Sequence, residues 1–167
     1  MAEESRGQGE DARFEDGAER PLRLAAETAE DLGVLSALVQ DALAGVGDVA
    51  WTPKRRKLTV LLRRFRWEDA PAARRQGRPY ERVQSILTIA DALRVRASGV
   101  DPADHDTAIS VLSIGFEPSE DGAGVVRLIL AGDGEIAVDV ECLDVALVDV
   151  SQPYLAQASR PPSHDET

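Results

Sequence analysis

Most segments after residue 48 read as strands, and in several of them apolar side chains recur at every second position, an alternation that constrains the fold more than any other feature of the sequence. In the segment GEIAVDVECLDVALVDV, residues 134–150, Ile136, Val138, Val140 and Cys142 alternate with polar or small residues. Period-two alternation is typical of a strand with one buried and one solvated face. Further strands are predicted near residues 22–24, 49–51, 57–65, 83–97, 107–116 and 124–132.

The alternation changes phase immediately after Cys142. From that point Leu143, Val145 and Leu147 form the apolar row, whereas Asp144 joins the polar row. A strand that continued straight through this shift would bury Asp144, so we predict a kink or a bulge. Kinks of this kind are needed in strongly curved sheets and at the corners of barrels.

One segment, residues 28–46, has helical instead of strand periodicity. Its apolar residues share one helical face: Leu32, Leu35, Leu38, Val39, Ala42, Leu43 and Val46. Thr28 is suited to cap the start of this helix, and Gly45 and Gly47 are suited to end it. The sequence therefore predicts an α+β protein. One N-terminal helix packs on a curved, mostly antiparallel sheet of six to seven strands, or on a partly open barrel.

The two ends of the chain differ in composition from the middle. Residues 1–19 are rich in Glu, Asp and Gly, and such a segment buries too little apolar surface to offset its ordering entropy. We predict a disordered acidic tail at 1–19, a single globular domain at 20–155 and a disordered C-terminal tail at 156–167. The N-terminus does not resemble a signal peptide, so we expect a cytoplasmic protein.

No group of residues has the pattern of a catalytic, cofactor or metal site. The histidines His105 and His164 fall in a turn and in the C-terminal tail. Cys142 falls on the apolar face of its strand, where a cysteine is usually a small buried side chain. A hard cation needs several converging oxygens, so we interpret the carboxylates of the opposite face as solvated. These carboxylates are Glu135, Asp139 and Glu141.

The charge of the chain is strongly segregated. The net charge is −11, yet the window from Lys54 to Arg82 holds eleven basic and three acidic residues, a local charge of +8. If Phe65 and Trp67 face the core, Arg64 and Arg66 face outward. Clustered cations can bind phosphates, or they can pair with the acidic strands of the same protein. The candidate anion-binding residues are Lys54, Arg55, Arg56, Lys57, Arg64 and Arg66.

Four segments together carry a resemblance to a known family. They are AEDLGVLSALVQDAL, VGDVAWTPKRRKLTVLLRRFRWE, ISVLSIGFEP and IAVDVECLDVALVDV. In this order they resemble the domain of unknown function 2948 family of small bacterial proteins, over residues 20–152. The resemblance implies a single soluble cytoplasmic bacterial domain, and it carries no catalytic residue to this sequence.

The function that these patterns favour is a non-catalytic binding or adaptor domain without a cofactor. Two alternatives stay open: an anion or nucleic-acid binder that uses the Lys54–Arg82 window, and an enzyme whose site no motif reveals. An unknown protein or a second copy of the chain is the expected partner. Nucleic acid is a disfavoured partner because the chain is acidic overall, and no membrane partner is expected.

Overall fold

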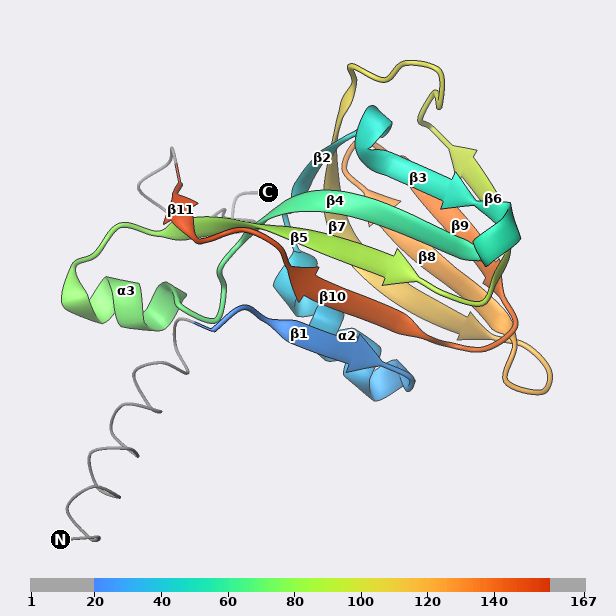
Figure 1. Ribbon diagram of the computed structural model, residues 1–167, viewed down its shortest axis with the longest axis horizontal. Coiled ribbons are helices and arrows are strands. Elements are labelled where there is room, and N and C mark those ends of the chain that lie inside the picture. The colour runs from blue at the N-terminus through green and yellow to red at the C-terminus, as the bar shows by residue number, and fades with distance from the viewer. Residues whose placement is uncertain (1–19, 157–167) are drawn as a thin grey trace, which may run out of the picture.

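The computed structural model describes residues 20–156 (Figure 1). The tails predicted at 1–19 and 156–167 therefore lie outside the described residues, except for Ala156. Within the described part, no helix is long and apolar enough to cross a membrane.

The described chain forms one large antiparallel sheet of eleven strands that does not close. The strand order is β1-β10-β5-β4-β2-β7-β8-β9-β6, with β3 paired to β4 and β11 paired to β5. The strands are β1 Arg23–Ala26, β2 Leu43–Gly45, β3 Val49–Thr52, β4 Lys57–Phe65, β5 Glu81–Ile89, β6 Ala92–Ser98, β7 Ala108–Pro118, β8 Gly124–Leu130, β9 Glu135–Val140, β10 Val145–Asp149 and β11 Tyr154–Leu155. The predicted α+β class and antiparallel pairing are confirmed, whereas six to seven strands is an underestimate.

The predicted N-terminal helix is present as α2, Ala29–Val39. The Thr28 hydroxyl accepts a hydrogen bond from the Asp31 amide at 3.1 Å, which caps the first turn. The helix ends earlier than predicted, because Asp41 adopts a positive φ and its amide bonds to the Val111 carbonyl of β7. The next residues form β2, which links β4 to β7.

A second helix, α3 Ala70–Gln76, was not predicted from the sequence. Pro71 lies in its first turn, where a missing amide proton costs nothing. Gly77 ends the helix with φ +65, a conformation that favours glycine. The described residues therefore contain two α-helices, and α3 projects from the sheet beside β11 (Figure 1).

The phase change after Cys142 marks a break between two strands. β9 pairs with β6 and β8, whereas β10 pairs with β1 and β5. A matching break occurs at Asp91, which has φ +53 and separates β5 from β6. The Glu141 amide donates to the Asp91 carbonyl at 2.9 Å, so the two corners lie side by side. The predicted kink is thus a corner at which the curved sheet turns.

The core lies inside the curve of the sheet, and α2 fills one open side by contacting β1, β4 and β7. Leu32, Leu35 and Val39 of α2 are fully buried there. They share one apolar cluster with residues of the strands, such as Leu62, Leu87, Val111, Leu128, Val138 and Leu147. Aliphatic side chains fill this core, in keeping with an aromatic content of only 4%.

Candidate ligand-binding cleft and basic hairpin

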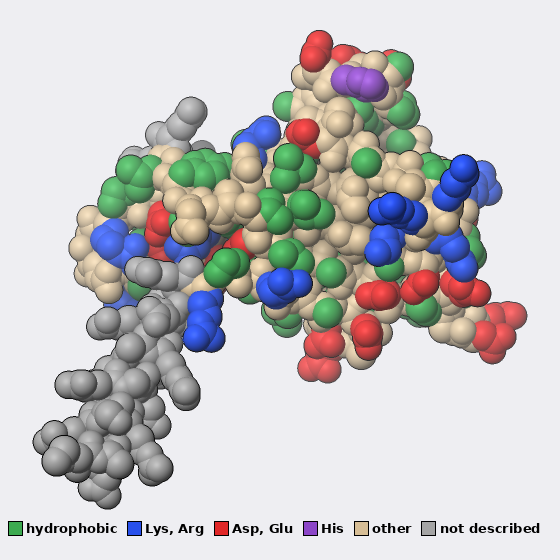
Figure 2. All heavy atoms as spheres, in the orientation of Figure 1, with side chains coloured by type: hydrophobic (Ala, Val, Ile, Leu, Met, Phe, Trp, Pro, Cys, Tyr) green, Lys and Arg blue, Asp and Glu red, His purple; other side chains and the backbone are tan. Residues whose placement is uncertain are grey.

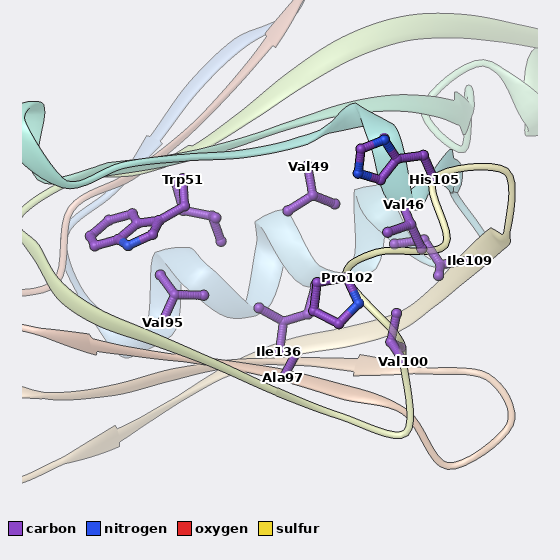
Figure 3. Close-up of a pocket in the computed structure, with 12 residues that line it drawn as sticks. Val46, Val49, Trp51, Val95, Ala97, Val100, Pro102, His105, Ile109 and Ile136 are labelled. Carbon is purple, nitrogen blue, oxygen red and sulfur yellow. The ribbon is translucent and has the colours of Figure 1, made fainter.

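An apolar cleft of about 340 Å³ opens between β3 and β6, at the side of the sheet that α2 does not fill (Figure 3). Among residues 20–156, β3 pairs only with β4 and β6 pairs only with β9, so each of these strands has one edge without a partner strand in the described chain. The lining is almost wholly apolar, with His105 as its one titratable side chain. It consists of Val46, Gly47, Val49, Trp51, Leu58, Val95, Ala97, Val100, Pro102, His105, Ile109 and Ile136.

Backbone hydrogen bonds bound the cleft at both ends. Next to the Trp51 end, the Ala92 amide of β6 donates to the Arg56 carbonyl at 2.9 Å. At the opposite end, the Gly47 amide donates to the His105 carbonyl at 3.2 Å, and Val46 is bonded in the same way to Thr107. The cleft is therefore a pocket of limited length and not a channel between two free edges.

The loop 99–107 covers the His105 end of the cleft (Figure 3). A Cβ at Gly47 would lie 3.4 Å from both the Cβ and the carbonyl oxygen of His105, an ordinary van der Waals distance, so the loop packs directly against residue 47. Within the loop, Asp101 accepts a hydrogen bond from the Ala103 amide. These contacts hold the loop as an ordered wall of the pocket.

The two ends of the cleft carry opposite charges. The Trp51 end adjoins the tip of the β3–β4 hairpin, which carries Lys54, Arg55, Arg56 and Lys57 within the 3-10 helix Pro53–Arg55 and the residues after it. The covering loop at the other end carries three aspartates: Asp101, Asp104 and Asp106. Figure 2 shows Lys and Arg gathered over the hairpin tip and β6, and Asp and Glu with histidine on the loop at the top.

One cation of the Lys54–Arg82 window pairs with the acidic segment, as one alternative from the sequence predicted: Arg56 forms an ion pair with Glu141. Arg96 of β6, outside that window, forms an ion pair with Asp139. Four others have no ion pair within residues 20–156, and we call them the basic rim: Lys54, Arg55, Lys57 and Arg94. All four side chains are exposed.

Arg64 does not belong to this surface, and the predicted outward orientation is wrong. Its side chain is fully buried, with Nη2 2.8 Å from a Glu68 oxygen and 3.1 Å from an Asp149 oxygen. Its Nε donates to the Ser85 hydroxyl at 3.1 Å. Burial alone would lower the pKa of Arg64, because it disfavours the charged form. The hydrogen bonds and negative charges of Glu68 and Asp149 outweigh this effect, so the pKa lies above its ordinary value.

Arg66 is also buried, so its predicted outward orientation is wrong as well. Its guanidinium lies 3.1 Å from Glu81 and 3.9 Å from Asp69. Asp69 also pairs with Arg78 at 3.1 Å. Burial alone would raise the pKa of Asp69, but the hydrogen bond and charge of Arg78 outweigh it, so that pKa is below its ordinary value. Burial raises the pKa of Glu81, and Arg66 only partly offsets this effect.

Cys142 is exposed, contrary to the predicted burial, because β9 ends at Val140 and the alternation does not extend to residue 142. Its Sγ lies 3.1 Å from a carboxylate oxygen of Asp91. The hydrogen bond to Asp91 raises the pKa of the thiol, and partial desolvation and nearby carboxylates add to the shift. A thiol with a raised pKa is a poor nucleophile at neutral pH.

The carboxylates of β9 and of Glu141, the residue after it, do not gather at one point. Glu135 pairs with Arg127, whereas Asp139 and Glu141 pair with other arginines. Among residues 20–156, no three His, Cys, Asp or Glu side chains form a group that could hold a metal ion.

The fold and the cleft define an α+β protein with an open, curved antiparallel sheet and an apolar pocket between the edges of β3 and β6. The chain belongs to the family described as protein of unknown function (DUF2948), which matches residues 22–164. The predicted family is thus confirmed. Comparison with curated proteins and with solved structures gave no match.

Proposed function

We propose that this protein is a non-catalytic binding domain whose ligand occupies the cleft between β3 and β6. The observation that carries this proposal is the cleft itself, about 340 Å³ of mostly apolar surface. Small-molecule sites are typically concave, apolar and about 300–1,000 Å³ in volume. The bacterial cytoplasm remains the compartment predicted from the sequence resemblance.

The chemistry of the lining favours binding over catalysis. His105 is the only titratable side chain that lines the cleft. The exposed thiol of Cys142 donates a hydrogen bond to Asp91, and the buried Ser85 hydroxyl donates one to Asp149. Neither group is among the residues that line the cleft. Nucleophilic catalysis needs a nucleophile and a base within hydrogen-bond reach of each other and of the substrate. The described lining supplies no such pair.

A titration with a neutral apolar dye, N-phenyl-1-naphthylamine, tests the proposal. We expect saturable fluorescence enhancement with the wild-type protein. An Ala97→Phe substitution places a ring at a lining position and should weaken binding about tenfold or more, a loss of about 1.4 kcal/mol. Ala50→Phe is the matched control, because Ala50 is exposed on β3 and does not line the cleft.

The control variant should bind the dye as the wild type does. Absence of saturable binding by the wild-type protein would refute the proposal. Equal dye affinities of the two phenylalanine variants would refute it as well, because the dye would then bind elsewhere.

A further inference from the structure

We propose that the cleft takes an amphipathic anion, with its apolar body against Trp51 and Val95 and its anionic head group at the basic rim. This inference rests on the proposed function and narrows it to one class of ligand. A long-chain carboxylate is the simplest member of this class.

The basic rim adjoins the cleft through the chain itself. Lys54 and Arg55 follow β3 shortly after Trp51, which lines the cleft. Lys57 and Arg94 immediately precede the lining residues Leu58 and Val95, but successive side chains of a strand point to opposite faces, so these two cations point away from the cleft and the head group relies on Lys54 and Arg55. Lysine and arginine stems can lie along apolar surface while their charged ends stay in water. An anionic head group at this end could therefore pair with cations that form no ion pair within residues 20–156.

The opposite end of the cleft gives the ligand a direction. Asp101, Asp104 and Asp106 of the covering loop place negative charge at the His105 end. Opposite charges at the two ends of a low-dielectric pocket create a field along it. This field favours an anionic head group at the hairpin tip and repels it from the loop.

The bounded ends of the cleft favour a compact ligand over an extended peptide. The Ala92–Arg56 backbone bond closes one end, and the Gly47–His105 bond closes the other. A strand that added to the edge of β6 would have to pass through both. Nucleic acid fits less well, because it needs a cationic track with several stacking aromatics, and the lining offers only the rings of Trp51 and His105, at opposite ends of the cleft.

A displacement assay tests the inference. Decanoate and decan-1-ol, which share an apolar chain and differ in head-group charge, compete with N-phenyl-1-naphthylamine at low ionic strength. We expect decanoate to displace the dye at about five- to tenfold lower concentration, the effect of one or two surface ion pairs. The preference should shrink as salt is added, because exposed charges are screened.

Charge-reversed variants locate the head group. The double substitution K54E/R55E should reduce the preference for decanoate to about one, since it removes two cations of the rim and adds two negative charges. The matched control is R74E/R75E, which changes the net charge equally on the exposed face of α3. The control should retain the preference, and the thermal melting of both variants establishes that they fold.

The outcomes separate the two proposals. If the dye binds but decanoate and decan-1-ol displace it equally well, the inference is wrong and the proposed function stands. Equal losses of preference in both charge-reversed variants would also refute the inference, because only net charge would then matter. Binding to anionic phosphatidylglycerol vesicles without displacement of the dye by decanoate would show that the rim serves a lipid surface instead. If the dye does not bind at all, both proposals fail.

Discussion

Arg64 of β4 and Asp149 of β10 form a buried ion pair, although the intervening strand β5 separates the two strands that carry them. Asp149 also accepts bonds from the Ser85 hydroxyl of β5 at 2.6 Å and from the Leu22 amide at 3.0 Å. One carboxylate thus joins three adjacent strands and the residue that precedes β1. This network fixes the end of the sheet opposite the cleft, near α3.

The first prediction concerns this network. Arg64→Ala leaves the buried carboxylate of Asp149 without its cation, and removal of one partner of a buried pair typically costs about 3–5 kcal/mol. We expect a loss of this size in the free energy of unfolding, measured by urea denaturation. Arg63→Ala is the control, because Arg63 has no ion pair within residues 20–156 and should cost under about 1 kcal/mol. Equal losses of unfolding free energy in Arg64→Ala and Arg63→Ala would show that the buried ion pair does not stabilise the fold more than an exposed arginine does.

The second prediction concerns pH. The pKa of Asp69 is lowered in the folded state, chiefly because Arg78 outweighs the effect of burial. Its stabilising contribution is therefore present above the unfolded pKa, about 3.9, and is lost as the pH falls through the lower folded value. We expect Asp69→Asn to lower the free energy of unfolding by about 2 kcal/mol at pH 7, the value of a charged hydrogen bond.

The measurement is the urea midpoint of wild type and Asp69→Asn as a function of pH. The difference between the two proteins should shrink in acid, below the ordinary aspartate pKa. Asp106→Asn, at an exposed loop position, should show no difference at any pH. A difference in urea midpoint between wild type and Asp69→Asn that stays constant down to pH 2.5 would contradict this account.

The third prediction concerns Cys142. The bond to Asp91 raises the thiol pKa, so the exposed thiol should react slowly with iodoacetamide at pH 7.5. Asp91→Asn removes the negative charge and should shift the pH profile of labelling downward, with severalfold faster reaction at pH 7.5. Asparagine tolerates the positive φ of residue 91, so the corner should keep its shape. An unchanged profile would mean that Asp91 does not control the thiol.

The strand pattern was enough to predict the antiparallel sheet, but the phase of β4 was misread. Leu58, Val60 and Leu62 are buried on β4, and the same phase continues to Arg64. The sequence thus contained the signal for a buried arginine. Phe65 indicated the opposite phase, and it is buried as well, so side chains of both phases are buried at this end of β4.

Other features could not be derived from alternation. The corner at Asp91 looks like a polar interruption of one strand, yet it sends β6 to the far edge of the sheet beside β9. The family resemblance implied no strand order. The cleft exists because β3 and β6, which are distant in the sequence, face each other in the folded sheet. No local sequence pattern shows that these segments come together. The strand predicted near residues 49–51 is present as β3, but the common environment of Val49 and Trp51 in the cleft depends on the fold.

The most direct test of the proposed binding site uses the two tryptophans as position markers. Trp51 lines the cleft, whereas Trp67 donates its indole proton to the Gln40 carbonyl and contacts Phe65. A bromine atom quenches indole fluorescence only at close contact, so 10-bromodecan-1-ol reports which ring a bound chain touches. We expect saturable quenching in Trp67→Phe, which retains Trp51, and little in Trp51→Phe. Quenching confined to Trp51→Phe, or none in Trp67→Phe, would contradict a ligand site between β3 and β6.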